Sequence, residues 1–247
     1  AEVINDHRPN TINYYAVGNG QTHSSTAAHT IEHLHADASG MHFNIKQADG
    51  KLLDQSFNLS LFGEHNVSNA LGVALVAKQI GISWDNIAKA FASFKGIKRR
   101  QEILGTPGDI TVIDDFAHHP TAVRETIAAI RTRFPKQKIW AVFEPRSNSS
   151  KRDVFQQDYP PAFLGADEII IHDVFMPQKV ADGKILNVPQ IVNDINTQTH
   201  TQKAHHISGI DNIIAMLKLK AKSGDVILVM SNGGFDGIYG KLIKELS

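Results

Sequence analysis

The sequence predicts an α/β protein whose second half is built on a mainly parallel sheet. From about residue 109, short apolar runs typical of buried strands alternate with segments that carry helix-start signals and helical spacing. This alternation indicates βαβ units. The earlier residues show strand and turn patterns followed by two helices. We therefore expect two domains, residues 1–105 with mixed α/β structure and residues 106–247 with helices flanking a sheet.

The composition is that of an ordinary globular protein. Of its 247 residues, 42% are hydrophobic and 20% are charged, and 25 Lys and Arg balance 25 Asp and Glu. Nothing in this balance favours broad binding to nucleic acid or to an anionic membrane. The absence of cysteine excludes disulfides and Cys-based zinc sites and is compatible with a cytoplasmic protein. No segment approaches the roughly 20 apolar residues of a transmembrane helix.

The first domain is expected to begin with antiparallel strands and to end with two helices. Asp49-Gly50 is a typical hairpin turn, and Ser83 is a typical cap for the second helix. Residues 95–105 read as a basic connection. The opening residues lack an initiator Met and resemble the middle of a domain, so we expect the chain to be part of a longer protein. The expected strands are 12–17, 41–45 and 56–61, and the expected helices are 70–80 and 87–94.

The second domain is expected to bring three polar segments to one edge of its sheet. Asp-Asp-Phe-Ala-His-His-Pro (114–120), Glu-Pro-Arg-Ser-Asn (144–148) and Ser-Asn-Gly-Gly-Phe (231–235) each follow an apolar run. Open parallel sheets bind ligands at the carboxyl ends of their strands. The expected strands are 110–114, 138–143, 168–172 and 225–230, and the expected helices are 121–133, 150–163, 210–222 and 237–246.

The residue types in the first of these segments allow two interpretations. Asp114 and Asp115 suit a ribose diol or a water-bridged metal, but they are also typical of carboxylates at a helix N-terminus. Phe116 can stack on a base or close the core. His118 and His119 are metal ligands only if a third ligand joins them.

Two other groups have the chemistry of nucleotide and carboxylate binding. Asn66 and Asn69 are three residues apart, so they share a helix face, and their amides match the edge of adenine; helix capping is the alternative. Arg100 suits phosphate oxygens and Arg146 suits a carboxylate, although a solvated linker and an ion pair with Glu144 would also explain them. The Gly-x4-Gly-Lys-Ser/Thr loop that cradles phosphates occurs nowhere in the sequence.

Taken together, these segments resemble the Mur ligase family of ATP-dependent amide-bond ligases. The residues that carry the resemblance are 63–69 (Gly-Glu-His-Asn-Val-Ser-Asn), 99–105 (Arg-Arg-Gln-Glu-Ile-Leu-Gly), 114–120 and 144–148. The resemblance implies the later part of a central ATPase domain followed by a Rossmann-like C-terminal domain. It also implies that the UDP-sugar domain and the phosphate loop lie outside this chain, which we expect to be inactive alone.

The resemblance further implies the substrates and the roles of particular residues. ATP with Mg²⁺ would phosphorylate the carboxylate of UDP-N-acetylmuramate, and an amine would then displace phosphate. Segments 143–148 and 229–235 resemble members that use the murein tripeptide L-alanyl-γ-D-glutamyl-meso-diaminopimelate. By this resemblance, Asn66, Asn69, Arg100, Asp115 and Phe116 contact ATP. Arg146, Ser147, Asn148 and His118 belong to the peptide side, and His118 is the one candidate catalytic residue.

Three alternatives stay open at this point. A family member that adds L-alanine would look similar, although such members carry Gln-Pro-His-Arg where this chain has Glu144 to Ser147. A metal-dependent hydrolase would use Asp114, Asp115, His118 and His119. A nucleotide-binding module without catalysis would bind ligand and turn nothing over.

Overall fold

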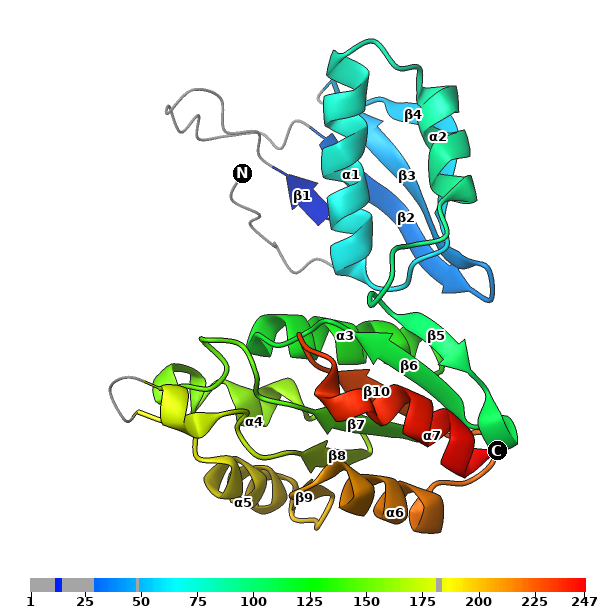
Figure 1. Cartoon of the computed structure of the whole chain (residues 1–247). Helices are drawn as coiled ribbons and strands as arrows, with labels where there is room; N and C mark the ends of the chain where they lie inside the picture. Colours follow the sequence, from blue (N-terminus) through cyan, green and yellow to red (C-terminus); the bar gives the residue numbers. More distant parts are fainter. Residues whose placement is uncertain (1–11, 15–28, 48, 181–183) are drawn as a thin grey trace. The chain divides into compact units, whose positions relative to one another are not determined.

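The structure is a computed structural model that describes residues 12–14, 29–47, 49–180 and 184–247 (Figure 1). The chain divides into two compact units, residues 1–96 and 97–247. Both combine helices with a sheet, which confirms the α/β class. Residues 97–105, which the sequence analysis placed in the first domain, include a strand of the second unit's sheet. The predicted domain boundary, between Gly105 and residue 106, stays a prediction.

The first unit is a four-stranded antiparallel sheet with two helices. Phe57 of its last strand packs against Phe43, Trp84 and Phe91, which ties the sheet to the second helix. The elements are β1 (Ile12–Tyr14), β2 (His29–Asp37), β3 (Gly40–Gln47), β4 (Leu52–Leu59), α1 (Glu64–Gln79) and α2 (Trp84–Ser93), with the strands in the order β1-β2-β3-β4.

Several expectations for this unit are confirmed, and others need correction. The turn at Asp49-Gly50 joins β3 to β4, and the Ser83 hydroxyl accepts a hydrogen bond from the Asn86 amide at the start of α2. Residues 15–17 of the first expected strand lie outside the described residues, and β2 was not expected. Helix α1 begins at Glu64, six residues earlier than expected, because the acidic side chain favours the helix N-terminus.

The second unit is a six-stranded sheet between two layers of helices (Figure 1). Its strands are β5 (Glu102–Gly105), β6 (Thr111–Asp115), β7 (Ile139–Phe143), β8 (Glu168–Ile171), β9 (Ala204–His206) and β10 (Val226–Met230). Its helices are α3 (Pro120–Arg133), α4 (Tyr159–Ala162), α5 (Val188–Thr199), α6 (Ile210–Lys220) and α7 (Ile238–Leu246), with 3₁₀ turns η1 (Pro107–Asp109), η2 (Asp153–Phe155), η3 (Pro177–Lys179) and η4 (Phe235–Gly237).

The sheet order is β5-β6-β10-β7-β8-β9, and every pair is parallel except β5 with β6. The expected mainly parallel sheet is thereby confirmed. Strand β10 is last in the sequence yet lies between β6 and β7, and Met230 is in register with both Asp115 and Phe143. The carboxyl ends of these three strands therefore lie side by side.

Both faces of the sheet are covered, which explains the uninterrupted apolar runs of the central strands. In β7, Ile139, Ala141 and Phe143 pack with α3, α4 and α5, whereas Trp140 and Val142 pack with α6 and α7. All five residues of β7 and all five of β10 are buried. A strand buried on both faces has no polar face to show in its sequence.

The helix expected over residues 150–163 is wrong. This region forms only the turn η2 and the four-residue helix α4. Pro160 and Pro161 have no backbone N–H to continue a helix. The preceding backbone pairs instead with a distant segment, through the Leu186 amide that donates to the Lys151 carbonyl and an antiparallel bridge between Arg152 and Ile185. Strands β5 and β9 and helix α5 were not expected.

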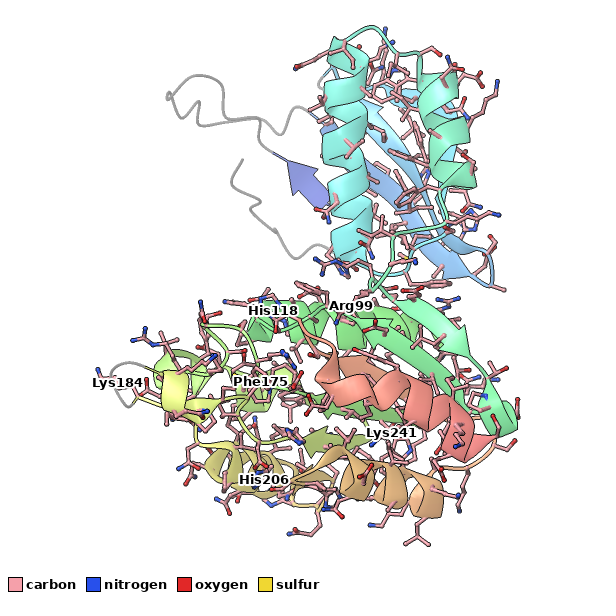
Figure 2. The ribbon with its side chains drawn as sticks, viewed as in Figure 1. Arg99, His118, Phe175, Lys184, His206 and Lys241 are labelled. Carbon is pink, nitrogen blue, oxygen red and sulfur yellow. The ribbon has the colours of Figure 1, made fainter. Side chains whose placement is uncertain are left out.

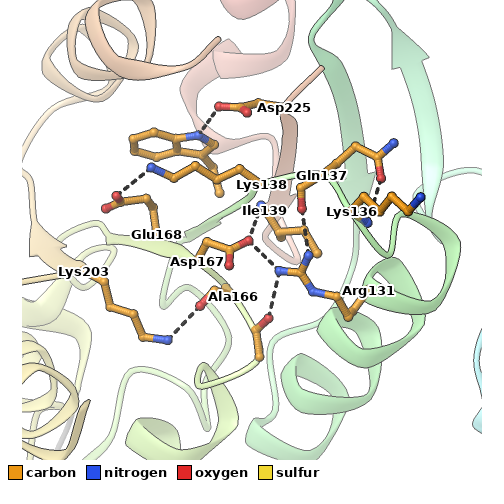
Figure 3. A network of polar contacts seen from close by, with 12 residues as sticks. Arg131, Lys136, Gln137, Lys138, Ile139, Ala166, Asp167, Glu168, Lys203 and Asp225 are labelled. Atoms are coloured by element: carbon orange, nitrogen blue, oxygen red, sulfur yellow. Dashed lines mark hydrogen bonds and ion pairs between the residues drawn. The ribbon is translucent and has the colours of Figure 1, made fainter. Parts of the chain in front are cut away.

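Ion pairs and hydrogen bonds close the amino-terminal edge of this sheet (Figure 3). Asp167 accepts hydrogen bonds from the Arg131 guanidinium and from the Ile139 amide. The indole of Trp140 donates to the Asp225 carboxylate at 2.9 Å, and this bond is buried. The polar groups named at this edge are hydrogen-bonded to one another or to the backbone.

We expect the first unit to depend on Gly40 at the start of β3. Its φ is +138°, and a Cβ there would lie 2.1 Å from the Leu59 carbonyl oxygen, a backbone atom. Gly40→Ala should lower the free energy of unfolding by about 2 kcal/mol or more, because strain and a clash act together. Gly72→Ala is the matched control, since a Cβ at this α1 position meets nothing within 4 Å. It should be neutral or stabilising by up to about 1 kcal/mol. Equal effects in urea denaturation would contradict the prediction.

Candidate active site

The polar strand ends of the second unit come together as the sequence analysis expected. Asp114 and Asp115 end β6, Glu144 follows β7, and Ser231 follows β10, which lies between them. Backbone bonds fasten these ends to one another: the Ser231 amide donates to the Asp115 carbonyl at 3.1 Å, and the Glu144 amide donates to the Met230 carbonyl at 3.1 Å. The three segments therefore form one continuous polar edge.

Asp115 is held by the protein itself. The residue is 3% exposed, and its two carboxylate oxygens accept hydrogen bonds from the backbone amides of Gln101 at 2.9 Å and Ala117 at 2.8 Å. The Thr126 hydroxyl adds a contact at 3.3 Å. Burial raises the pKa of Asp115, and these hydrogen bonds together with the charge of Arg100 oppose that rise. The carboxylate thus holds the backbone at Gln101 and at Ala117 to the end of β6. Its contact with a ribose stays a prediction.

Arg99 connects two strand ends. Its Nε donates to Asp114 at 3.1 Å, and one terminal nitrogen donates to the carbonyls of Ser231 at 2.6 Å and Gly233 at 2.8 Å. Its own carbonyl accepts from the Phe116 amide at 2.9 Å. The planar guanidinium can serve these partners at once, which an ammonium group on Lys cannot do with the same geometry.

Phe116 lies against two guanidinium groups and an imidazole. The Arg99 and Arg100 side chains lie 5.1 Å and 5.3 Å from its ring centroid, and the ring of His118 meets it edge-on at 5.5 Å. Arg100 is exposed, whereas Phe116 and His118 are half-buried. Arg100 and Phe116 therefore offer a cation beside an aromatic surface at the end of β6. Figure 2 shows Arg99 and His118 on the same edge of this unit.

His118 and His119 have different environments. The Nδ1 atom of His118 lies 2.9 Å from the Phe116 carbonyl oxygen, a contact that requires a proton on Nδ1 when the ring is neutral and leaves Nε2 able to accept one. His119 caps α3, where its Nδ1 accepts from the Thr121 amide at 3.3 Å, and its ring packs on Phe155. Of the two, only His118 presents the geometry of a proton acceptor on this edge.

Arg146 is positioned by three neighbours. It donates to Glu144 at 3.3 Å, and its guanidinium lies 3.6 Å from the centroid of the Phe175 ring. Glu144 is 1% exposed and accepts a second hydrogen bond from the Ser231 hydroxyl at 2.5 Å. A Cβ at Gly233 would lie 2.1 Å from the Arg146 Nε. The absence of a side chain at Gly233 is what lets Arg146 reach this place.

Ser147 and Asn148 continue from Arg146 along the same segment. The Ser147 hydroxyl accepts from the Ser150 amide at 2.9 Å, and the Ser147 amide donates to the Ser150 hydroxyl at 2.9 Å, so these two residues close a tight turn. Asn148 is exposed and lines a cavity of about 580 Å³ with Ser149 and residues 152–154 and 184. Peptide binding by these residues stays a prediction.

Asn66 and Asn69 belong to the first unit, where both line one mainly apolar pocket of about 400 Å³. The side-chain amide of Asn66 donates to the Phe62 carbonyl at 2.7 Å, which fixes the orientation of this side chain at the start of α1. The expected shared face is thus present. Adenine binding by the pair stays a prediction. The other lining residues are Leu59, Leu61, Ala70, Val73, Ala90, Phe91 and Phe94.

Two findings concern metals and membranes. Within the described residues, no three His, Cys, Asp or Glu side chains are grouped to hold a metal ion. No helix in the described part of the chain is long and apolar enough to cross a membrane.

Sequence reasoning missed Gln101, Phe175 and Gly233 and gave Arg99 no separate role. Positive φ angles at Arg99 (61°) and Gln101 (52°) turn the backbone so that the Gln101 amide meets Asp115, and neither residue type signals such a conformation. Phe175 comes from the loop after β8, remote in sequence from Arg146. The two glycines at 233–234 indicate that another group approaches the backbone closely, but the sequence does not show that this group is Arg146.

An α/β unit with a polar edge at the carboxyl ends of its central strands is typical of nucleotide-dependent enzymes. Residues 99–233 match the family described as Mur ligase, glutamate ligase domain. This match covers more than half of the chain, so the chain belongs to the Mur ligase family, and the resemblance seen in the sequence is confirmed.

The individual relatives are named as ligases of two kinds. The UDP-N-acetylmuramate–L-alanyl-gamma-D-glutamyl-meso-2,6-diaminoheptandioate ligase of Escherichia coli K12 is 38% identical over 190 residues, which are 76% of this chain and 39% of that protein. The Haemophilus influenzae ligase of the same name is 36% identical over 216 residues, 87% of this chain and 44% of that protein. The UDP-N-acetylmuramate–L-alanine ligase of Delftia acidovorans is 33% identical over 223 residues, 86% of this chain and 45% of that protein.

A solved structure agrees with the sequence relatives. The murein peptide ligase of Psychrobacter arcticus 273-4 is 32% identical, with a TM-score of 0.64 over 90% of this chain and 44% of that chain. This chain therefore spans less than half the length of each of these four relatives.

We expect Gly233→Ala to displace Arg146 from the face of Phe175, because the new methyl group would occupy the position of the guanidinium nitrogen. Gly234→Ala is a matched control on the adjacent residue, where a Cβ meets nothing within 4 Å. The Arg146 Nε–H resonance, which the Phe175 ring current shifts, should move toward its free-arginine position in the first variant only. An unmoved resonance in Gly233→Ala would show that Arg146 does not depend on this glycine.

Proposed function

We propose that the native protein carrying this chain is an ATP-dependent amide ligase of peptidoglycan recycling. It joins L-alanyl-γ-D-glutamyl-meso-diaminopimelate to UDP-N-acetylmuramate in the cytoplasm. The observation that carries this proposal is the 38% identity over 190 residues with the Escherichia coli ligase named for this tripeptide. The arrangement of Arg100, Phe116 and Arg146 along one strand edge supports it, since these groups suit phosphate, a nucleotide and a carboxylate.

The proposed reaction has two steps. The γ-phosphoryl group of ATP passes to the carboxylate oxygen of UDP-N-acetylmuramate, the bond to the β-phosphate oxygen breaks, and ADP leaves. The amine of the tripeptide then attacks the acyl carbon, the amide C–N bond forms, and the C–O bond to phosphate breaks. The amine must lose a proton before or during the attack. Mg²⁺ would accompany the phosphates of ATP, and no residue of this chain is assigned to it.

The residues of this chain would bind and orient the reactants. Arg100 beside Phe116 would neutralise phosphate charge, and Asp115 would contact the ribose from the end of β6. His118 would take the proton of the incoming ammonium group through Nε2, because the contact at Nδ1 leaves that nitrogen without a proton in the neutral ring.

The remaining roles follow the same proposal. Arg146 and the Ser147–Asn148 segment would hold the acceptor peptide, and Asn66 and Asn69 would contact adenine with their amides. The sequence holds no Gly-x4-Gly-Lys-Ser/Thr loop, so we infer that this chain by itself does not turn over ATP.

Phosphate release tests the reaction class and the substrates together. The protein expressed from its complete gene should release phosphate only when ATP, UDP-N-acetylmuramate and the tripeptide are all present. Free L-alanine in place of the tripeptide should give none. Release that requires L-alanine would instead identify the L-alanine ligase, which is the second candidate because relatives of that name include one that is 33% and one that is 36% identical. Release from phosphoesters without either acceptor would indicate a hydrolase.

We expect Arg100→Ala to raise the KM for ATP about tenfold with little change in the free energy of unfolding. Arg100 is exposed and its loss removes a charge-assisted contact worth roughly 1.5–3 kcal/mol. Lys98→Ala, another exposed cation two residues away, is the control and should leave the KM unchanged. Steady-state kinetics at saturating tripeptide measures the KM for ATP of both variants. An unchanged KM in Arg100→Ala would remove the phosphate role of this residue.

A further inference from the structure

A second cluster of charges lies beyond the strand edge, in the cavity of about 580 Å³ that Asn148 lines. Its charged residues are Arg152, Asp153 and Lys184, all exposed, and Ser149 and Val154 complete the lining. The volume lies within the roughly 300–1,000 Å³ of small-ligand sites. None of these charged residues has a role in the reaction described above.

The two cations come from distant parts of the sequence that the backbone holds together. Arg152 and Ile185 form an antiparallel bridge, the Asp153 amide donates to the Lys184 carbonyl at 3.0 Å, and the Leu186 amide donates to the Lys151 carbonyl at 2.9 Å. The segment that carries Lys184 is thus fastened to the segment that carries Arg152 and Asp153. In Figure 2, Lys184 lies at the end of this unit away from Lys241, with Phe175 between them.

The cavity is continuous along the chain with the residues proposed for the peptide. Arg146 lies at the end of β7, Ser147 follows it, and Asn148 opens the cavity. The reciprocal hydrogen bonds between Ser147 and Ser150 hold the backbone of this segment in a turn between Arg146 and the cavity. A peptide whose amine lies at the strand edge would therefore extend toward Arg152 and Lys184 with its far end.

The charges that line the cavity favour a ligand residue with complementary charges. Among the described residues that line the cavity, two are cations and one is a carboxylate, a formal sum of +1. The terminal residue in the names of the two most similar relatives reported above is meso-2,6-diaminoheptandioate. Once one amine is acylated, that residue carries two carboxylates and one ammonium group, a formal sum of −1. Each charge of such a residue has an opposite partner in the cavity, whereas a free L-alanine acceptor has no group to place there.

We propose that this cavity is the subsite for the terminal diamino-dicarboxylate residue of the acceptor peptide. Arg152 and Lys184 bind its two carboxylates, and Asp153 binds its free ammonium group. The proposal rests on the proposed function, because it assigns a location to the far end of the same substrate. It makes these three side chains determinants of acceptor specificity that do not touch the reacting atoms.

The test uses the protein expressed from its complete gene with acceptors of different length. Arg152→Gln and Lys184→Gln should each raise the KM for the tripeptide about tenfold, the effect of losing one charge-assisted contact. The KM values for ATP and for L-alanyl-γ-D-glutamate, which lacks the terminal residue, should not change. Lys220→Gln and Arg124→Gln, at exposed positions on α6 and α3, are the matched controls and should behave as wild type.

A second pair of measurements isolates Asp153. Asp153→Asn should raise the KM for the tripeptide but not for an analogue that ends in 2-aminopimelate, which keeps both carboxylates and lacks the free ammonium group. If wild type uses the tripeptide and the variants change kcat alone, or change the dipeptide KM equally, the subsite is overturned while the ligase function stands. If wild type does not use the tripeptide, the proposed function fails and this assignment fails with it.

Discussion

Three buried carboxylates at the ends of two strands determine the arrangement of the site. An ionised group out of water is costly unless it is paired or hydrogen-bonded, and each of the three has its partners. Asp114 receives the Arg99 guanidinium, Asp115 receives two backbone amides, and Glu144 receives Ser231 and Arg146. These partners come from the segment before β5, from the β6–α3 loop, from the segment after β7 and from the turn after β10. Satisfying the carboxylates therefore fixes the loops around the strand ends.

The turn after β10 is shared by the two sides of the site. Arg99 binds its carbonyls at Ser231 and Gly233, and Arg146 packs over Gly233 from the β7 side. The groups proposed for ATP and the groups proposed for the acceptor thus rest on the same few backbone atoms. The Ser231 hydroxyl also donates to Glu144, the carboxylate that accepts from Arg146, so the turn bound by Arg99 is hydrogen-bonded to the residue that holds Arg146.

The sequence predicted the central strands and the polar edge, because long apolar runs and the chemistry of their endings are local signals. Asp114, Glu144 and Ser231 lie where the expected strands end. It did not predict β5 or the role of Gln101, since left-handed backbone at Arg99 and Gln101 is selected by Asp115, a residue met later in the chain. The prediction of a helix over residues 150–163 failed for the same reason, a contact with a distant part of the sequence. The polar, helix-compatible start of this segment pairs with residues 184–186, which no local pattern reveals.

The position of β10 has a consequence for how the protein folds. This strand lies between β6 and β7 in the sheet, yet residues 116–225 separate it from β6 in the sequence. Strands β6 and β7 do not pair with each other, so β10 alone connects them. Parallel pairings across such separations carry a large loop-closure entropy and are slow to form. During synthesis, β6 and β7 leave the ribosome long before the strand that unites them. The two halves of the polar edge therefore stay incomplete until β10 is made, and the strand edges of β6 and β7 that β10 covers are unpaired during that interval.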